Sequence, residues 1–275
     1  MISFDDMNNI PIHIKTKISL PIVSSANCKK IISCKPEWGM MEKKDIQNII
    51  NSYTNDIDKI IYIFLISDSC DEFTIPQNIR LYRTSLYKSK QNNNEYLLPY
   101  IWEGITKSVP NLERGDFPIV GFCGLNSKFR KKTLQLFKSN KNIKSNFIIR
   151  NKFWGGNPHH PKLIYDFENN MVCSHFNICN RGNGNFSMRF YQTLSCGRIP
   201  ILLNTDMILP FEEEIKWNDI IILGDTEEEL VTNVLYYWNT KNILKMQIKC
   251  KEIYNKYFSN TNFLDNILSD STSIN

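Results

Sequence analysis

The sequence is poor in residues that mark several common protein classes. Its 275 residues include a single alanine, Ala26, with only 11 glycines and 11 prolines, which excludes a collagen-like or low-complexity chain. Hydrophobic residues make up 42% and charged residues 22%, which excludes a disordered chain. The length allows one large domain or two small ones. Asn, Ile and Lys are abundant instead, which indicates an A+T-rich genome.

The sequence also lacks metal, disulfide and membrane signatures. Its eight cysteines form no C-x-x-C pair and have no regular spacing to histidine, so we expect neither a zinc site nor a disulfide framework. No basic segment followed by an apolar run stands near the amino terminus, and no apolar run approaches the roughly 18 residues that span a bilayer. We expect a soluble, cytoplasmic protein without a membrane anchor.

The charge excess is small. The chain has 33 basic and 28 acidic residues, a net charge of +5. This value favours a local pocket for an anion over a broad basic surface, and we expect no nucleic-acid partner. The basic helix expected over residues 127–140 has its cations around an apolar stripe, which is typical of a solvated helix face over a core.

Apolar runs of strand length alternate with helical patterns, which predicts an α/β fold with parallel sheets. In the first half we expect a helix over 43–56, strands over 60–66 and 79–87, and a loop over 88–95. A segment without apolar periodicity, 107–117, indicates a domain boundary, and the predicted domains are 1–112 and 113–275. In the second half we expect strands over 117–124, 146–150, 171–179, 198–204 and 218–224, and helices over 127–140, 187–197, 225–239 and 244–258. The last helix either closes the second domain or packs back on the first.

The most informative motif is a Gly-rich segment, residues 179–189, between an expected strand and an expected helix. Gly182 and Gly184 allow close approach of the backbone, and Ser187 can cap the helix. Arg181 and Arg189 add two permanent cations, so the segment predicts an anion site, most plausibly for a diphosphate. The alternative is a simple turn whose arginines pair with nearby acids.

The segment from Asn177 to Leu223 resembles the carboxy-terminal signature of exostosin-like glycosyltransferases, with a Gly-rich loop, a Ser-x-Arg helix start, Leu-Pro-Phe and a tryptophan. The blocks VGFCG and FIIRNKFWGG, and RTSLYKSKQNNNEYLLPY upstream, resemble other parts of small viral and microbial members such as the chlorovirus proteins. The resemblance implies two Rossmann-like domains facing across a cleft (the GT-B arrangement), a nucleotide-sugar donor, inversion at the anomeric carbon and no required metal or other cofactor.

The resemblance also implies which residues bind the donor. They are Arg130, Arg150, Arg181, Gly182, Asn183, Gly184, Asn185, Ser187, Arg189 and Gln192. Gln192 departs from the family, which has a glutamate there that commonly holds the donor ribose. An amide can still bond a ribose diol, but without charge assistance.

Inverting transfer needs a base for the acceptor hydroxyl. The strand over 60–66 leads into Asp68 and Asp71, which we predict as the candidate bases; a turn or capping role is the alternative. Glu95 and Glu103 are weaker candidates. Arg83, Tyr87 and Glu95 suit an acceptor sugar site, where aromatic faces and charged groups meet hydroxyls.

Other features are less specific. His159 and His160 indicate a surface loop more than a metal site, and His175 a hydrogen-bonded core residue. Phe153 and Trp154 could stack on a base or pack in the core.

The sequence therefore predicts an inverting glycosyltransferase that uses a UDP-sugar, with UDP-xylose the first candidate, and a glycan acceptor. The alternatives are a non-catalytic nucleotide- or sugar-binding module of the same fold and, more distantly, a nucleic-acid-binding protein.

Overall fold

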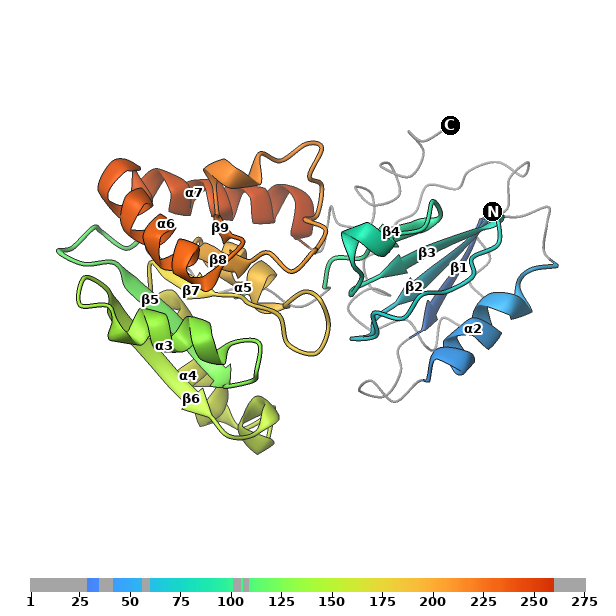
Figure 1. The fold of residues 1–275 in the computed structure, drawn as a ribbon, viewed down its shortest axis with the longest axis horizontal. Helices are drawn as coiled ribbons and strands as arrows, with labels where there is room; N and C mark the ends of the chain where they lie inside the picture. The colour runs from blue at the N-terminus through green and yellow to red at the C-terminus, as the bar shows by residue number, and fades with distance from the viewer. Residues whose placement is uncertain (1–28, 35–41, 56–59, 101–104, 106–108, 260–275) are drawn as a thin grey trace.

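Two parallel β-sheets form the framework of the protein (Figure 1). The computed structural model describes residues 29–34, 42–55, 60–100, 105 and 109–259. The first sheet has the order β1-β2-β3-β4 and the second has the order β6-β5-β7-β8-β9, and all their pairings are parallel. The predicted α/β fold is thus confirmed.

The first unit is small. Its strands are β1 (Lys29–Cys34), β2 (Ile60–Leu65), β3 (Ile79–Arg83) and β4 (Glu95–Leu97), with helix α2 (Lys43–Ser52) and the 3-10 turn η1 (Lys88–Lys90). Ile46 and Ile50 of α2 pack against one face of the sheet. Aromatic rings of Tyr62, Phe64 and Tyr82 pack together as well. The central strand β2 is apolar throughout because, like strands of other parallel sheets, it is buried on both faces.

The second unit holds the larger core. Its strands are β5 (Ile119–Leu125), β6 (Lys144–Arg150), β7 (Phe176–Ile178), β8 (Ile199–Leu203) and β9 (Ile222–Gly224). Its helices are α3 (Lys131–Ser139), α4 (Pro161–Val172), α5 (Arg189–Ser195), α6 (Glu227–Thr240) and α7 (Ile243–Ile253), with short turns η2 (Phe153–Gly156), η3 (Trp217–Asp219) and η4 (Tyr254–Phe258). Thr226 caps the start of α6 by accepting a hydrogen bond from the Glu229 backbone N–H.

The strand order reverses direction within the second sheet. The chain passes from β5 outward to β6 and then returns to the other side of β5 to form β7. Because parallel crossovers are right-handed, the helices that follow β5 and β7 cover opposite faces of the sheet. The carboxyl ends of β5 and β7 therefore frame a topological switch point, the place where α/β proteins bind ligands.

The structure corrects several sequence-based expectations. Residues 171–172 end helix α4 and only 176–178 form a strand, so the predicted strand over 171–179 is wrong in its first half. Helix α4 was not predicted, and neither were β1 and β4. The exposed Ile164 and Tyr165 of α4 interrupt the apolar periodicity by which a helix is recognised in a sequence. Helix α7 and η4 pack on α5 and the second core. The boundary between residues 112 and 113 stays a prediction.

No helix in the described part of the chain is long and apolar enough to cross a membrane.

A fully buried arginine ties the segment before β5 to the second core. Arg198 is 1% exposed, and the described residues to which it donates hydrogen bonds all offer neutral oxygens. Its acceptors are the backbone carbonyls of Pro110, Val172, Cys196 and Gly197 and the side-chain oxygen of Gln247. The guanidinium thus links four separate segments of the chain by hydrogen bonds.

Replacing Arg198 by methionine should lower the free energy of unfolding by about 3 kcal/mol or more, because several buried carbonyls would lose their donor. The matched control is Arg114→Met, since Arg114 is exposed and its guanidinium lies over the ring of Trp238. Urea unfolding of both variants measures the difference, and equal stability of the two would contradict this role for Arg198.

His175 is a core residue held in one neutral form. It is 3% exposed; its Nδ1 accepts from the Ile119 backbone N–H, and its Nε2–H donates to the Glu113 carbonyl. The ring also packs edge-on against Trp238. Burial, with the nearby charge of Arg198, lowers the pKa of His175, outweighing the opposite effect of the Glu113 carbonyl. The predicted core role is confirmed.

Stability should fall as the pH drops from 7 to 5. The folded state binds the His175 proton more weakly than the unfolded chain, whose histidine pKa is about 6.5, so acid favours unfolding. His175→Gln keeps a donor and an acceptor but cannot titrate, and its thermal midpoint should fall less over the same range. An identical pH profile for the two proteins would show that His175 is not the group responsible.

Candidate functional site

Arg189 lies across the carboxyl ends of β5 and β7, the two strands at the topological switch point. Its Nη2 donates to the Cys123 carbonyl of β5 at 2.7 Å, and its Nη1 to the Ile178 carbonyl of β7 at 3.4 Å. The guanidinium stacks on the Phe122 ring, 4.5 Å from the centroid. Burial lowers the pKa of Arg189, so its positive charge is held where water screens it weakly. The strand ends therefore present a cation.

Arg130 lies next to this cation, at the start of α3. It is 9% exposed, and it donates from Nε to the Asn180 carbonyl and from Nη1 to the Leu125 carbonyl, at 3.2 and 3.3 Å. Its Nη2 points to the Gly-rich segment, 3.4 Å from where a side chain on Gly182 would begin. Burial, with a smaller contribution from Arg189, lowers the pKa of Arg130 to about 9. Arg130 and Arg189 are thus held close together although their positive charges repel each other.

Arg181 contributes a third cation from the loop after β7. Its guanidinium lies 4.7 Å from the Phe129 ring centroid and 5.6 Å from that of Tyr87, which belongs to the first unit. Its Nη1 donates to the Tyr87 hydroxyl at 2.9 Å and to Asn185 Oδ1 at 2.8 Å, and its Nη2 donates to the Asn183 carbonyl at 2.7 Å. Aromatic rings and the loop itself therefore hold Arg181 in place.

None of these three arginines has a carboxylate within 4.0 Å among the described residues. The Nε atoms of Arg181 and Arg189 and the hydroxyl of Ser127 are buried without a hydrogen-bond partner. Arg198, by contrast, has its donors bound to carbonyls and an amide. Buried charges are normally paired, so the cluster of Arg130, Arg181 and Arg189 is suited to an anionic ligand.

Arg150 lies at the edge of this arrangement. It ends β6, and its Nη2 donates to the Leu163 carbonyl of α4 at 2.7 Å. Its charge, with that of Arg189, opposes the effect of burial on the pKa of the Cys123 thiol, so the two guanidiniums act on the same strand end.

The Gly-rich segment does less for an anion than the sequence predicts. A side chain on Gly184 would begin 2.9 Å from Asp68 Oδ1 and 3.2 Å from Asp68 Cα, so this glycine permits close approach of the first unit. Asn185 is 1% exposed; its backbone N–H donates to the Ser85 hydroxyl, and its amide donates to the carbonyls of Leu86 and Asp206. Asn185 therefore joins the units, and its prediction as a donor-binding side chain is corrected.

The start of α5 also differs from the prediction. The helix has seven residues, begins after Met188 and has no side-chain hydrogen bond at its cap, so Ser187 does not cap it. Ser187 is 8% exposed, Gln192 is 7% exposed one turn further on, and Asn183 is exposed. The positive charge at this site therefore comes from the arginine side chains more than from the helix end.

Asp68 and Asp71, the two predicted bases, have different surroundings. Asp68 is exposed, touches the Gly-rich segment and accepts a hydrogen bond from the Tyr100 hydroxyl at 3.1 Å. Burial and the nearby Asp68 charge raise the pKa of Tyr100, so its hydroxyl remains a donor. Asp71 instead accepts from the Ser69 hydroxyl at 2.7 Å in a tight turn. Only Asp68 faces the second unit; Glu103 lies outside the described residues.

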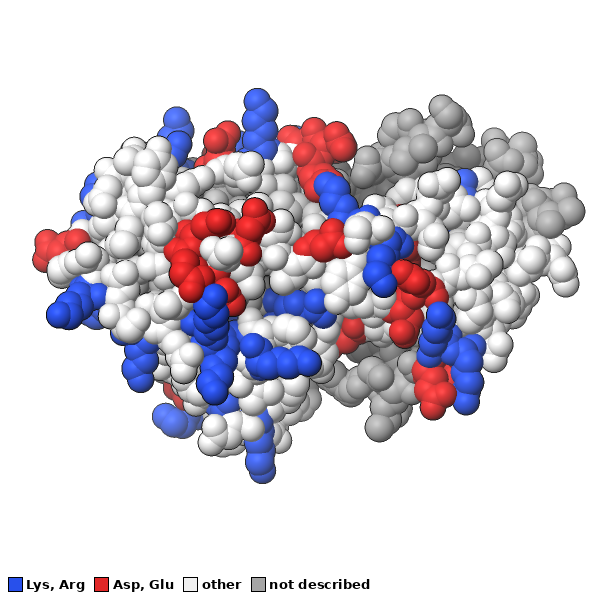
Figure 2. Space-filling view, viewed as in Figure 1, with Lys and Arg blue, Asp and Glu red and all other residues white. Residues whose placement is uncertain are grey.

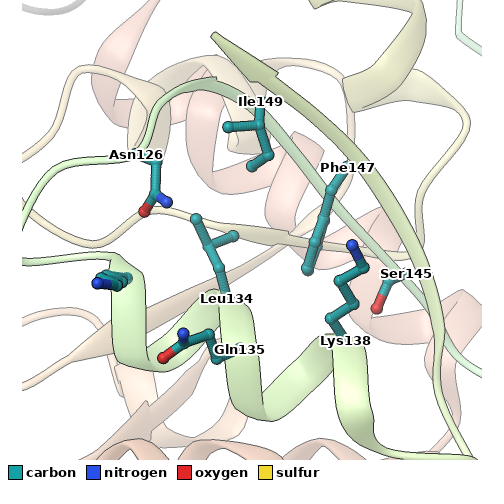
Figure 3. Close-up of a pocket in the computed structure, with 8 residues that line it drawn as sticks. Asn126, Leu134, Gln135, Lys138, Ser145, Phe147 and Ile149 are labelled. Carbon is teal, nitrogen blue, oxygen red and sulfur yellow. The ribbon is translucent and has the colours of Figure 1, made fainter. Parts of the chain in front are cut away.

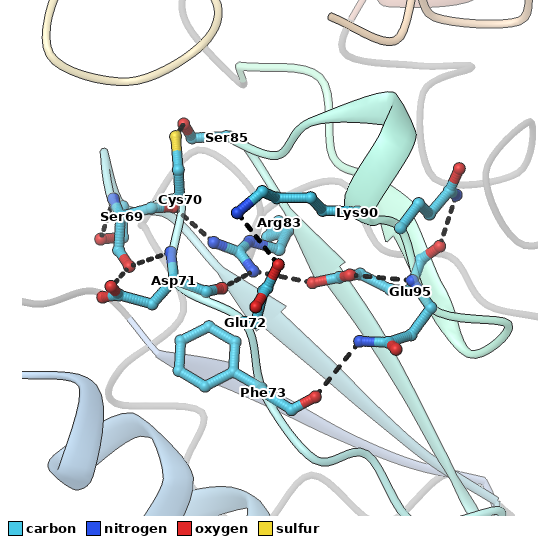
Figure 4. A network of polar contacts seen from close by, with 12 residues as sticks. Ser69, Cys70, Asp71, Glu72, Phe73, Arg83, Ser85, Lys90 and Glu95 are labelled. Carbon is cyan, nitrogen blue, oxygen red and sulfur yellow. Dashed lines mark hydrogen bonds and ion pairs between the residues drawn. The ribbon is translucent and has the colours of Figure 1, made fainter. Parts of the chain in front are cut away.

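Arg83 and Glu95 are not available to an acceptor sugar (Figure 4). Both are 2% exposed and they form an ion pair at 2.7 Å. Arg83 also donates to the backbone carbonyls of Ser69 and Asp71. This pair shapes the loop that carries Asp68, and the predicted sugar contacts are corrected. They are buried because β3 pairs with β4, which brings the two side chains together inside the unit.

Several contacts between the units were not predicted. Lys88 forms an ion pair with Glu212 at 2.6 Å, and the Ser89 hydroxyl donates to Asp206 at 2.5 Å. Tyr87, predicted as an acceptor residue, faces Arg181 instead. The carboxyl ends of both sheets thus meet around the Gly-rich segment, the GT-B arrangement that the sequence predicts. Nothing in the sequence pairs these residues, because their contacts depend on how the units pack.

The described residues contain no group of three His, Cys, Asp or Glu side chains that could hold a metal. His159 and His160 are both exposed, as expected for a surface loop.

Comparison with known proteins gives a partial match. Residues 120–234 match the Exostosin GT47 domain. Exostosin-1 of Drosophila melanogaster is 30% identical over 95 residues, 34% of this chain and 12% of that protein. The Exostosin-1 homolog of Caenorhabditis elegans is 24% identical over 94 residues, 34% of this chain and 25% of that protein. The match to the solved structure of TarM covers 82% of this chain and 56% of the TarM chain, with a TM-score of 0.42 and 10% identity.

The chain therefore spans a quarter or less of the length of these curated relatives. The matched domain contains Arg130, Arg181 and Arg189, whereas Asp68 lies outside it.

An anion site at the arginine cluster predicts that UDP raises the thermal midpoint of the protein. Arg130→Met should abolish that rise, without the stability loss expected for Arg198→Met. The methionine keeps the packing on Phe122 and removes a buried cation that repels Arg189. Thermal unfolding of both variants with and without UDP measures this contrast. A normal UDP shift in Arg130→Met would contradict the anion assignment.

Proposed function

We propose that this protein is an inverting glycosyltransferase that moves a sugar from a UDP-sugar to a hydroxyl of a glycan acceptor. The observation that carries the proposal is the cluster of Arg130, Arg181 and Arg189 near the switch point, with Arg130 buried and the other two half-buried, all without a carboxylate within 4.0 Å among the described residues. Asp68 of the other unit lies near enough to Arg130 to affect its pKa. The match of residues 120–234 to the Exostosin GT47 domain supports it, because all three arginines lie within that match.

The arginine cluster would stabilise the leaving group. When the bond between the anomeric carbon and the phosphate oxygen breaks, negative charge develops on the diphosphate. Donors that are already in place stabilise such charge without reorganising. The donors that we propose for this role are the Nη2 of Arg130, which lies beside Gly182, and the Nε of Arg181 and of Arg189, which have no hydrogen-bond partner. We propose that these cations do the work that a metal does in other transferases, so that no metal is required.

Asp68 would act as the base. Inversion requires the acceptor oxygen to attack the anomeric carbon from the side opposite the diphosphate, while a carboxylate takes its proton. Asp68 belongs to the first unit, the arginines belong to the second, and the Gly-rich segment lies between them. Tyr100 would orient the carboxylate through its hydrogen bond. The products are the glycoside, UDP and a protonated Asp68.

A pentose donor, with UDP-xylose first, is proposed on the sequence resemblance to small viral members. The competing function is a binding module that holds UDP or a UDP-sugar without turnover. It is motivated by Gln192, which occupies the place of the glutamate that the resemblance implies and is buried in α5.

Asp68→Asn should retain UDP affinity and slow sugar transfer by roughly 10²- to 10⁴-fold, the usual contribution of a general base. Asp71→Asn is the matched control, since its carboxylate is held in the Ser69 turn, and it should keep the wild-type rate. Release of UDP from a panel of UDP-sugars, with and without glycan acceptors, measures both. UDP binding without turnover for any combination of UDP-sugar and acceptor would favour the binding module. A full rate of sugar transfer in Asp68→Asn would place the base elsewhere.

A further inference from the structure

The charge of the protein is concentrated in one part of the chain. Between Asp116 and Asp166 the sequence contains ten lysines and arginines and no acidic residue, whereas the rest of the chain has more acidic than basic residues. This stretch forms β5, α3, β6, η2 and the start of α4. Because β6 is the last strand on its side of the second sheet, we call this region the β6 edge. The β6 edge is therefore strongly basic, although the net charge of the whole chain is small.

Most of the cations of the β6 edge are exposed and unpaired. Lys132 forms ion pairs with Glu227 and Glu228, and Arg130 and Arg150 turn inward. Seven exposed lysines have no acidic group within 4.0 Å among the described residues; one of them, Lys128, lies over the ring of Phe129. The other six are Lys131, Lys138, Lys141, Lys144, Lys152 and Lys162. Figure 2 shows lysine and arginine side chains gathered around the lower part of the second unit, where α3, α4 and β6 lie, and acidic ones mainly above them.

The same region carries exposed apolar side chains. Of the eight large hydrophobic residues exposed in the described chain, five belong to it: Phe117, Ile149, Phe153, Ile164 and Tyr165, with exposed fractions from 42% to 60%. Phe153 stands before a sharp turn in which Trp154, Gly155 and Gly156 all have positive φ, so the chain reverses directly behind it. Apolar and basic groups that coincide in this way are characteristic of interaction surfaces.

A hollow of about 300 Å³ opens between α3 and β6 (Figure 3). Leu134, Phe147 and Ile149 supply its apolar lining, and Lys131 and Lys138 come from α3 beside them. The hollow thus combines an apolar floor with cations, as the whole edge does.

Protection of an edge strand does not account for these lysines. Lysine on an edge strand discourages pairing with other chains, but only Lys144 lies on β6, and the other six lie on α3, on α4 or in the connecting turns. Nucleic acid would explain the lysines and the aromatic rings but not the exposed Ile149 and Ile164, since an aliphatic side chain gains nothing beside a phosphate backbone.

We propose that the β6 edge binds the surface of an anionic lipid bilayer. The lysines would meet the acidic headgroups, and Ile149, Phe153, Ile164 and Tyr165 would enter the boundary between headgroups and acyl chains. Binding of this kind is peripheral and needs no membrane-spanning helix. The proposal does not depend on the proposed enzymatic activity, because none of these residues belongs to the arginine cluster or contacts Asp68.

Sedimentation of the full chain with vesicles tests the proposal. Vesicles of phosphatidylcholine with phosphatidylserine should carry the protein down at low salt, and phosphatidylcholine alone should do so much less. The double variant Lys138→Gln/Lys144→Gln should bind the acidic vesicles at least roughly tenfold more weakly than the wild type does. The matched control is Lys241→Gln/Lys245→Gln at the junction of α6 and α7, which should bind as the wild type does.

A second variant separates lipid from other polyanions. Phe153→Ser/Ile164→Ser keeps every lysine and should also weaken vesicle binding, and UDP binding should be unchanged in all of these variants. Absence of binding to acidic vesicles, equal loss in the control, or an unaltered Phe153→Ser/Ile164→Ser would overturn the proposal. So would binding to oligonucleotides that displaces the protein from vesicles without depending on Phe153 and Ile164.

Discussion

The placement of three buried or half-buried guanidinium groups near the ends of β5 and β7, without carboxylate partners among the described residues, is the constraint on which the site depends. Such an arrangement costs stability in the empty protein, as the lowered pKa of Arg130 shows. It persists because backbone carbonyls at the strand ends and the rings of Phe122 and Phe129 hold the groups in place. The strand order dictates where these carbonyls meet. An anion with two phosphates would relieve the repulsion and use the donors that remain.

The first unit completes this arrangement through its contacts and hydrogen bonds with the Gly-rich segment. Gly184 leaves room for Asp68, Asn185 is bonded to Ser85 and Leu86, and Tyr87 receives a hydrogen bond from Arg181. The segment that holds a cation is therefore also the contact between the units. A change in how the units pack would move Arg181 and Asp68 together, so binding of the anion and placement of the base are coupled through this contact.

The sequence predicted those features that leave a local signal. Buried strands such as β2 are continuous apolar runs, and the arginines stand beside glycines between a strand and a helix. It did not predict features that depend on long-range pairing. Arg83 and Glu95 look like surface sugar contacts until β3 and β4 pair and bury them. Helix α4 escaped prediction because part of its apolar surface, Ile164 and Tyr165, faces outward. The role of Tyr100 beside Asp68 has no counterpart in the sequence pattern.

A crystal structure of the protein with UDP would test the central claim most directly. We expect the diphosphate to lie at the carboxyl ends of β5 and β7, with phosphate oxygens within hydrogen-bond distance of Arg130, Arg181 and Arg189. A diphosphate bound elsewhere in the molecule, with the three guanidiniums still directed only at backbone carbonyls and aromatic rings, would contradict it.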